Sequence, residues 1–332
     1  MLAAMGEFDL IARYFTRPVA RAALGVGDDC ALLLPAPGMQ LAVSSDMLVE
    51  GRHFFADVDP FALGHKALAV NLSDLAACGA RPLAFTLALA LPQADEAWLQ
   101  GFSGGLLALA DAHGCELVGG DTTCGPLNIC ITVFGEVPVV NGISQALLRS
   151  GARAGDDLYV SGTLGDARLA LEALRGNIDL PPELLAQARM RLERPTPRVA
   201  LGQALRGVAS AALDLSDGLL GDLGHILAQS GVGATVNAFS AIELIAAFAH
   251  PAWGSGLVSL KNQLEFALAG GDDYELAFTA PVSARDAVQA AARQADTPVT
   301  RIGHIDAEPG LRLQGASGQP LPGEFASFDH FA

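Results

Sequence analysis

Acidic side chains in this chain gather at a few short segments rich in glycine or hydroxyl residues instead of spreading evenly along the sequence. Glycine lets the backbone approach a ligand closely, and short carboxylates are hard oxygen ligands that suit Mg²⁺ or Ca²⁺. A single Gly-Asp pair is an ordinary turn, but the whole set predicts turns that converge on a site where metal ions hold a polyphosphate. The segments are Gly25-Val26-Gly27-Asp28-Asp29, Ser44-Ser45-Asp46, Asn71-Leu72-Ser73-Asp74, Gly119-Gly120-Asp121-Thr122-Thr123, Asp214-Leu215-Ser216-Asp217-Gly218 and Gly270-Gly271-Asp272-Asp273.

Composition limits the size of the fold and the class of its partners. The chain has 332 residues, of which 51% are hydrophobic and 17% charged, so it is long enough for one large or two medium globular domains. Its net charge of −16 argues against nucleic acid or an anionic membrane as the main partner. An acidic protein still binds phosphates where cations mediate the contact, and the acidic segments provide for that.

Cysteines and apolar runs indicate a cytoplasmic protein. The cysteines number five and none are spaced Cys-x-x-Cys, so neither a disulfide framework nor a zinc site is indicated. Residues 1–15 lack the basic stretch and apolar core of a signal peptide. The longest apolar run, Leu83–Leu91, is too short to span a membrane.

Hydrophobic periodicity and turn residues predict alternating helices and strands. Their comparable number and their order predict an α+β fold with a mainly antiparallel sheet in the first part. The segment Arg149–Asp157 is polar and contains two glycines, which is typical of a linker between domains. We therefore expect a domain boundary near it, with domains at 1–148 and 149–332. Helices are expected at Glu7–Phe15, Asp59–Cys78, Glu96–His113, Leu164–Ala173, within Pro181–Pro197, at Gly218–Gln229 and Ser283–Ala295. Strands are expected at Cys30–Leu34, Gln40–Ser44, Leu83–Leu91, Cys115–Val118, Leu127–Val137, Leu158–Ser161, Ala209–Asp214, Tyr274–Thr279 and Val299–Ile305.

Several common ways of holding ATP are missing from the sequence. There is no Gly-x-x-x-x-Gly-Lys-Ser/Thr loop, and neither Lys66 nor Lys261 stands in a phosphate loop. The protein-kinase motifs, the Gly-x-Ser-x-Gly elbow and the His-Glu-x-x-His zinc motif are absent too. Carboxylates would therefore hold ATP through metal, with the bare N–H groups of Gly119-Gly120-Asp121 facing phosphate oxygens.

Three further residues admit both a functional and a structural interpretation. Arg149 is either a fixed positive charge near the β- and γ-phosphates or a solvated arginine at the domain joint. His53 is either a ligand contact or a surface histidine after a turn. Phe328 is either a ligand contact or a hydrophobic anchor of the C-terminal tail.

The acidic segments, together with the sequence around them, resemble the thiamine-monophosphate kinase family. The resemblance runs from Gly6 to His330 and so covers almost the whole chain. Single turns such as Gly-Gly-Asp are shared with the related aminoimidazole-ribonucleotide synthetases and selenophosphate synthetases, whereas the His53 block and the Asp-His-Phe tail are more particular to the kinases. The matching segments are Gly6–Ile11, Gly27–Ala31, Ser45–Phe54, Lys66–Asp74, Gly119–Thr123, Asp214–Leu219, Tyr274–Leu276 and the tail Asp329-His330-Phe331.

The resemblance implies a two-domain synthetase-like fold. Its N-terminal domain would carry a mixed or antiparallel sheet with helices, dimerise and hold ATP and Mg²⁺, and its C-terminal α/β sandwich domain would complete the active site. Asp121, Asp74 and Asp214 would be catalytic, and Gly120, Asp121, Arg149 and Ser216 would touch ATP. His53, Asp272 and Phe328 would bind thiamine monophosphate. Several Mg²⁺ ions are implied, with ligands Asp29, Ser44, Ser45, Asp46, Asp74, Asp121, Asp214 and Asp217.

Two positions stay open at this level. The family usually has Gly-Gly-Glu-Asp where this chain has Gly270-Gly271-Asp272-Asp273, so either Asp272 or Asp273 takes the place of the glutamate. Asp28 and Asp29 are also both available as the metal ligand.

The implied reaction is ATP-dependent phosphorylation of thiamine monophosphate to thiamine diphosphate, the last step of thiamine diphosphate biosynthesis, in a cytoplasmic homodimer. One rival hypothesis is a related ATP-using enzyme, such as an aminoimidazole-ribonucleotide synthetase, with the same metal segments and a different acceptor pocket. The other is a metal- or nucleotide-binding protein that binds without turnover. A metal-dependent phosphatase is disfavoured because no Asp-x-Asp-x-Thr motif is present.

Overall fold

The computed structural model describes residues 6–254, 256–321 and 325. The chain divides into two compact units. The first unit takes in the residues up to Leu75 together with Ala80–Gln145, and the second takes in Ala76–Gly79 and the residues from Ala146 onward. None of the helices in the described residues is both long and apolar enough to cross a membrane.

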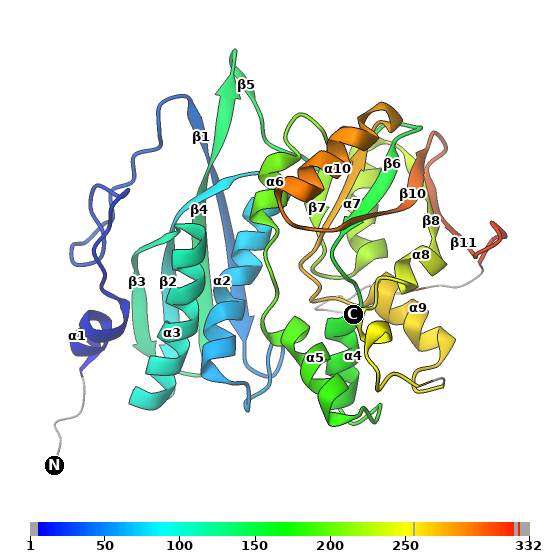
Figure 1. Ribbon diagram of the computed structural model, residues 1–332. Helices are drawn as coiled ribbons and strands as arrows, with labels where there is room; N and C mark the ends of the chain where they lie inside the picture. The colour runs from blue at the N-terminus through cyan, green and yellow to red at the C-terminus, as the bar shows by residue number, and fades with distance from the viewer. Residues whose placement is uncertain (1–5, 255, 322–324, 326–332) are drawn as a thin grey trace. The chain divides into compact units, whose positions relative to one another are not determined.

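The first unit is a mixed sheet with two long helices (Figure 1). Its strand order is β1-β4-β2-β3, with the short β5 paired to β4. β2 and β3 run parallel, joined through helix α3, and the other pairings of the sheet are antiparallel. The strands are β1 (Met39–Val49), β2 (Arg81–Leu91), β3 (Glu116–Cys124), β4 (Asn128–Val140) and β5 (Ile143–Ser144), and the helices are α1 (Glu7–Leu10), the π-helical turn η1 (Ile11–Phe15), α2 (Pro60–Ala77) and α3 (Glu96–His113).

The boundaries of the two long helices follow from local sequence. The side chain of Asp59 accepts the N–H of Ala62 at 2.9 Å ahead of Pro60, the first residue of α2. Asp95 caps α3 by accepting the N–H of Trp98 at 2.9 Å, and Gly114 ends that helix in a left-handed conformation. Both helices were expected at these positions.

Glycines bring α2 and α3 into close contact. A Cβ atom on Gly64 would lie 2.0 Å from the carbonyl oxygen of Phe102, and one on Gly105 would lie 1.9 Å from that of Phe61. Any larger residue at either position would push the helix backbones apart, so the glycines allow this packing.

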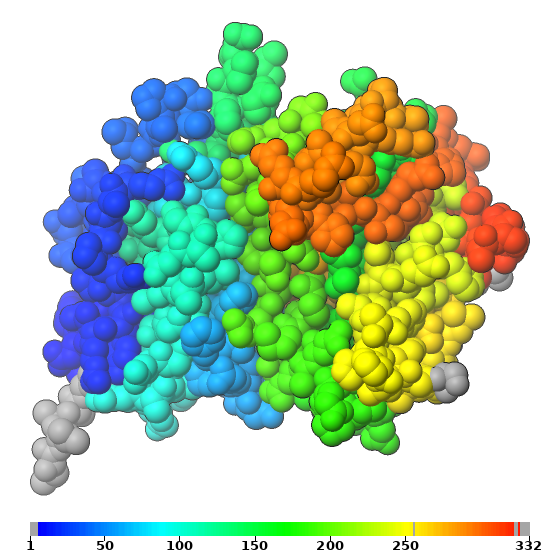
Figure 2. Space-filling view, viewed as in Figure 1, coloured from blue at the N-terminus to red at the C-terminus, as the bar shows by residue number. Residues whose placement is uncertain are grey.

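The second unit is built on a six-stranded sheet of order β11-β8-β10-β6-β9-β7, in which β8 and β11 run parallel and the other pairs antiparallel. Its core is one cluster that joins strand residues such as Val160 and Ala277 to helix residues such as Leu169, Leu223 and Leu268. Side chains of α9, in yellow, and α10, in orange, form part of the surface seen in Figure 2. The elements are β6 (Asp157–Ser161), α4 (Asp166–Leu174), α5 (Pro182–Glu193), α6 (Val199–Ala204), β7 (Ala211–Asp214), α7 (Leu219–Ser230), β8 (Gly233–Asn237), α8 (Ala238–Ile242), the 3-10 turn η2 (Ala246–Ala249), α9 (Leu260–Ala269), β9 (Leu276–Ala280), the 3-10 turn η3 (Val282–Ala284), α10 (Arg285–Gln294), β10 (Val299–Asp306) and β11 (Gly310–Gln314).

The architecture confirms the predicted α+β class and corrects several local expectations. Two of the acidic segments are strands instead of turns, Ser44-Ser45-Asp46 within β1 and Gly119–Thr123 within β3, and Asn71–Asp74 lies within α2, where the helix was expected to run. The reason is that each continues the hydrogen bonding of a longer element, as β1 does by pairing with β4 over its full length. The expected strand Cys30–Leu34 is also wrong, since this stretch makes a single bridge, between Leu24 and Leu32.

Candidate functional site

A pocket of about 640 Å³ in the first unit brings together two of the acidic segments. Gly27, Asp28 and Asp29 line it from one side, and β3 contributes Gly119 to Thr122. The rest of the wall is mostly apolar, with Phe8, Ile11, Phe15, Val26, Ala31, Leu87, Leu117 and Val118. The lining also includes the carboxylate of Glu7, so that with Asp28, Asp29 and Asp121 four carboxylates stand at the pocket. A pocket with an apolar part, bare backbone and carboxylates suits a molecule that has a flat base and a phosphate chain bound through cations.

A bulge in β3 shapes the glycine wall of this pocket. The register between β2 and β3 shifts after Phe85, so that Leu117 pairs with Phe85 and Gly119 with Thr86. Gly120 follows with φ of 146°, and a Cβ there would lie 1.8 Å from the carbonyl oxygen of Leu87. Only glycine fits, and the neighbouring Asp121 is exposed at the pocket.

Glu116 anchors the segment that leads to Asp28 and Asp29. Its carboxylate accepts the backbone N–H groups of three consecutive residues, Ala20, Arg21 and Ala22, at 2.7 to 3.2 Å. Burial alone would raise the pKa of Glu116, but these N–H groups and the charge of Arg21 outweigh it, so the pKa is lowered. The carboxylate is thus fixed in its ionised form at neutral pH.

Glu136 is a second anchor, on β4. It is buried, accepts the N–H of Ala36 at 2.8 Å, and pairs with Arg21 at 3.1 Å and Arg81 at 2.5 Å. Although burial favours the neutral acid, the Ala36 N–H and the two arginines lower the pKa of Glu136. Together the two glutamates hold a segment that has little regular structure of its own.

Strand β1 and helix α2 meet through the next pair of acidic segments. The hydroxyl of Ser44 donates to the carboxylate of Asp74, and the backbone N–H of Asp46 donates to Asn71 at 3.1 Å. Ser45 points to the opposite face, where its hydroxyl lies 2.9 Å from that of Thr132 on β4. This follows from the two-residue period of a strand, which separates Ser45 from its neighbours.

His53 lies in the turn after β1. Its Nδ1 accepts the N–H of Val49 at 3.0 Å, which makes Nδ1 the unprotonated nitrogen, and its carbonyl accepts from Lys66 at 3.2 Å. The ring is therefore fixed in orientation, with Nε2 as its donor atom.

In the second unit two acidic segments lie side by side. The carbonyl of Ser216 accepts the N–H of Asp272 at 2.8 Å, and the carbonyl of Leu215 accepts that of Tyr274 at 2.8 Å. The N–H of Leu215 donates to the backbone carbonyl of Glu275 at 2.8 Å. Asp272 and Tyr274 have φ of 64° and 50°, values uncommon for residues other than glycine. The Asp214–Gly218 loop and the Gly270–Asp273 turn thus form one backbone unit.

Asp222 supports the same loop from the first turn of α7. Its carboxylate accepts the N–H groups of Asp217 at 3.0 Å and Gly218 at 3.1 Å. Burial raises the pKa of Asp222 to about 6, with the charge of Asp217 adding to the effect while the two N–H groups oppose it. Asp214 itself is buried at the end of β7, whereas Ser216 and Asp217 are partly exposed.

The two candidates for the family's glutamate have different surroundings. Asp273 is buried, with one carboxylate oxygen accepting the N–H of Gly165 at 2.9 Å and the other lacking a hydrogen-bond partner. Burial raises the pKa of Asp273 well above its usual range. Asp272 is partly exposed. This arrangement favours Asp272 over Asp273 as the residue that meets a ligand.

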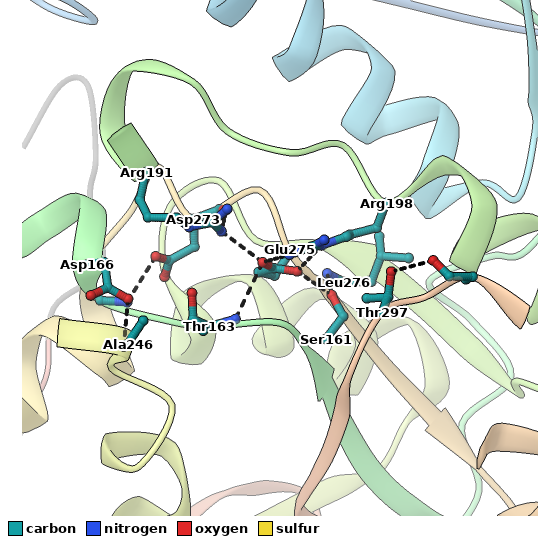
Figure 3. A network of polar contacts seen from close by, with 12 residues as sticks. Ser161, Thr163, Asp166, Arg191, Arg198, Ala246, Asp273, Glu275, Leu276 and Thr297 are labelled. Carbon is teal, nitrogen blue, oxygen red and sulfur yellow. Dashed lines mark hydrogen bonds and ion pairs between the residues drawn. The ribbon is translucent and has the colours of Figure 1, made fainter. Parts of the chain in front are cut away.

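A network of buried charges supports the start of β9 (Figure 3). Glu275 has no exposed surface and binds Arg198 through two contacts of 2.6 and 2.5 Å, Arg191 at 2.8 Å and the hydroxyl of Ser161 at 2.6 Å. Asp166, nearby, accepts the N–H groups of Ala246 and Ala247 at 2.9 Å each, and its pKa is raised by burial. Glu275 lies in a segment that matches the family, but none of these buried groups was given a role from the sequence, because each depends on contacts between distant segments.

The carboxylates fit Mg²⁺ by their chemistry but are not assembled around a metal position. Asp28, Asp29 and Asp121 line one pocket, and all are hard oxygen donors. Within the described residues, however, no three or more Asp, Glu, His or Cys side chains stand close enough together to hold an ion. Phosphate oxygens and water would have to supply the remaining ligands, as is usual for Mg²⁺.

The other predicted site residues are placed as follows. Arg149 is exposed, and its carbonyl accepts a 3.4 Å contact from the hydroxyl of Ser230. Phe328 lies outside the described residues. The missed residues with a supporting role are Glu116, Glu136, Arg191, Arg198, Asp222 and Glu275.

Comparison with known families matches both parts of the chain. Residues 27–137 match the AIR synthase related protein, N-terminal domain, and residues 153–316 match the AIR synthase related protein, C-terminal domain. The matched ranges include all of the acidic segments, the first of them from Gly27 onward, so the segments belong to the shared framework of that fold.

Individual relatives match over nearly the full length. The chain is 46% identical over 335 residues to the thiamine-monophosphate kinase of Salmonella typhimurium and 44% identical over 337 residues to that of Escherichia coli, each match covering 99% of both chains. Among solved structures, the thiamine-monophosphate kinase of Stenotrophomonas maltophilia has a TM-score of 0.80 and 47% identity, covering 92% of this chain and 94% of its own. The structure of AaThiL complexed with AMPPCP and TMP has a TM-score of 0.71 and 27% identity, covering 90% of this chain and 89% of its own.

Proposed function

Because the chain belongs to the thiamine-monophosphate kinase family, we propose that it transfers the γ-phosphoryl group of ATP to thiamine monophosphate, forming thiamine diphosphate. The observation that carries the proposal is the pocket that joins the Gly27-Asp28-Asp29 segment to Gly119-Gly120-Asp121. It combines an apolar wall for a base with bare backbone and carboxylates for a cation-bound phosphate chain.

The chemistry needs positioning and charge neutralisation more than acid–base catalysis. The acceptor is a phosphate monoester whose second pKa is about 6, so its attacking oxygen is already an anion at neutral pH. The obstacle is repulsion between this anion and the phosphates of ATP. In-line transfer therefore depends on holding the two anions together and on stabilising the charge that shifts to the leaving group.

On the nucleotide side, Gly119 and Gly120 line the pocket and have no side chain to block a phosphate from their backbone. Asp29 and Asp121, with Asp28 as the alternative to Asp29, would hold Mg²⁺ ions bound to the phosphates, and Asp74 with Ser44 and Asp46 would form a further set on α2 and β1. When bound, Mg²⁺ supplies charge neutralisation and a template for the phosphate oxygens. Ser45 would take part through its backbone, since its side chain faces the other side of the sheet.

On the second unit, Asp214 and Asp217 are proposed as metal ligands and Ser216 as an ATP contact, with Arg149 as a positive charge for the phosphates. These roles fit a loop whose backbone is fixed by Asp222 and by the adjoining turn. Arg149 has the exposure that such a contact requires.

For thiamine monophosphate, we propose contacts from His53, Asp272 and Phe328. His53 has Nε2 as its donor atom because Nδ1 accepts the N–H of Val49, and Asp272 is partly exposed with a carboxylate that suits the cationic thiazolium. An aromatic side chain at 328 would stack on the heterocycle, an effect worth about 1 kcal/mol.

We also propose that the chain acts as a cytoplasmic homodimer formed through the first unit. Strand β1 exposes Leu41, Val43 and Met47 at alternate positions, a row of apolar side chains on one face of the sheet. A second copy of the chain would bury that row. The free thiols of all five cysteines are consistent with a reducing cytoplasm.

The test is an acceptor comparison with the purified chain, ATP and Mg²⁺. Formation of ADP and thiamine diphosphate with thiamine monophosphate, and neither with formylglycinamidine ribonucleotide, the acceptor of an aminoimidazole-ribonucleotide synthetase, supports the proposal. ADP formation with the second acceptor alone favours the synthetase hypothesis. Binding of ATP without turnover on either acceptor favours a binding protein.

A further inference from the structure

The turn that carries Asp272 has a strained backbone held in place by buried charges. Asp272 and Tyr274 both have positive φ, at 64° and 50°, although neither is glycine. Such conformations persist when the surrounding structure fixes them, and they concentrate at functional sites. The backbone contacts to Leu215 and Ser216 fix one side of this turn.

The other side is fixed by an arginine from α5. The guanidinium of Arg191 donates to the carbonyl of Asp273 at 3.3 Å and to the carboxylate of Glu275 at 2.8 Å (Figure 3). It therefore bridges the backbone between the two strained residues to a carboxylate that is itself immobilised by Ser161. Arg191 is mostly buried, with 19% of its side chain exposed.

Arg198 differs from Arg191 in one respect that matters. Its guanidinium binds both carboxylate oxygens of Glu275, at 2.6 and 2.5 Å, and within this network its side chain contacts Glu275 only through that carboxylate. A bidentate pair of this kind is the stronger of the two contacts to Glu275. The two arginines thus share one carboxylate, whereas Arg191 also contacts the backbone of the turn.

We propose that Arg191 is a positioning residue for the acceptor substrate: it holds the Asp272 turn in the conformation that presents the Asp272 carboxylate to thiamine monophosphate. The inference rests on the proposed function and deepens it. Arg191 acts through the turn and does not itself touch substrate. Its loss lets the turn relax toward ordinary backbone angles, which moves Asp272 away from the acceptor. The loop with Ser216 stays in place because the carboxylate of Asp222 holds the N–H groups of Asp217 and Gly218, and the nucleotide pocket of the first unit is unaltered.

The test compares Arg191→Gln with the matched variant Arg198→Gln by steady-state kinetics and thermal melting. We expect Arg191→Gln to raise KM for thiamine monophosphate roughly tenfold, since small misplacements of a positioned group have effects of that order or larger, with KM for ATP within about twofold of wild type. Arg198→Gln is expected to lower Tm at least as much, with KM for thiamine monophosphate within about twofold of wild type. Equal rises of that KM in both variants, a parallel rise in KM for ATP, or no rise in Arg191→Gln would overturn the proposal.

A double-variant cycle tests whether Arg191 acts through Asp272. If it does, Arg191→Gln combined with Asp272→Ala has the same KM for thiamine monophosphate as Asp272→Ala alone, and additive effects contradict the proposal. Should Arg191→Gln fail to fold, Arg191→Lys replaces it in both experiments, since lysine keeps the charge beside Glu275 without the forked donors. An unchanged KM in a folded Arg191→Lys overturns the proposal too. Turnover by the wild type is measured first, so that its absence counts against the proposed function and not against the role of Arg191.

Discussion

The two units hold their acidic segments in opposite electrostatic ways. In the first unit, the anchoring carboxylates Glu116 and Glu136 accept backbone N–H groups and face arginines, and their pKa values are lowered. In the second unit, Asp166 and Asp222 are buried beside their segments, and burial raises their pKa values. The comparison shows that one chain can position functional carboxylates either by anchoring a surface segment with ionised groups or by bracing a strained turn from within a buried network.

The largest expected effect concerns Asp121, the carboxylate at the glycine wall of the pocket. Asp121→Asn keeps the size of the side chain but weakens its hold on a cation, so we expect turnover to fall by about 10²-fold or more, comparable to losing one preorganised electrostatic contact. The measurement is kcat with saturating ATP and thiamine monophosphate. A folded variant with near wild-type turnover at saturating Mg²⁺ would remove Asp121 from the site.

Gly120 offers a test of backbone shape in the same pocket. A Cβ in Gly120→Ala would lie 1.8 Å from the carbonyl oxygen of Leu87, so the strands must move apart, at an expected cost of about 2–4 kcal/mol in the free energy of unfolding. Gly142→Ala is the matched control, because Gly142 also has positive φ, 77°, but no atom stands within 4 Å of the added Cβ. The control should cost about 1 kcal/mol, the strain of a left-handed residue alone. Equal losses in urea unfolding would mean that close packing against β2 does not require the glycine.

Ligand binding should stabilise the chain only when a divalent cation accompanies ATP. The carboxylates of the pocket repel an anion until metal neutralises them, so ATP with Mg²⁺ at about 100 times its Kd should raise Tm by about 5 °C, whereas ATP with a chelator should give little change. A thermal melt in each condition, with Mg²⁺ alone as control, measures this. The same rise with ATP and chelator would contradict a metal-mediated site.

The smallest expected effect is a difference in pH dependence between the units. Glu116 has a folded pKa below its unfolded value, so its contribution to stability is complete above its ordinary titration range and is lost as the pH falls through the folded pKa. Asp166 has a folded pKa above its unfolded value, so the native state binds its proton more tightly and gains stability as the pH falls through that pKa.

Urea unfolding of Glu116→Gln and Asp166→Asn at pH 7 and pH 4 measures this difference. Relative to wild type, Glu116→Gln should be more destabilising at pH 7 than at pH 4. Asp166→Asn resembles the protonated acid, so at pH 7 it should destabilise the protein less than Glu116→Gln does. At pH 4 the wild-type Asp166 gains stability by binding its proton, so this difference between the two variants should disappear. Identical pH profiles for the two variants would remove the electrostatic contrast between the units.

The sequence predicted those elements whose boundaries are marked by local chemistry. Helix α3 was expected over the residues that form it, and the structure shows that Asp95 caps its start and Gly114 ends it. Strands β8 and β11 were missed, since their short segments are stabilised by pairing with each other and with β10 more than by any local pattern. The prediction of a turn at Ser44 to Asp46 was also wrong. Hydroxyls and a carboxylate are typical of a turn, but pairing with β4 makes this segment part of a strand.

In the candidate site, too, the sequence predicted one group of residues and not the other. The acidic segments were visible in the sequence, and the pocket joins two of them. The supporting residues were not visible: Arg191 and Glu275 are separated by more than 80 residues, and nothing local to either indicates the other. Family resemblance added the identity of the acceptor, which no spacing of residues reveals.

The central claim, that carboxylates hold ATP through divalent cations for transfer to thiamine monophosphate, is tested most directly by the Mg²⁺ dependence of thiamine diphosphate formation. The account predicts no product in the presence of chelator, product and ADP in equal amounts as Mg²⁺ is added, and a higher half-saturating Mg²⁺ concentration for Asp121→Asn. Formation of thiamine diphosphate at the full rate in chelator, or ADP without thiamine diphosphate at every Mg²⁺ concentration, would contradict it.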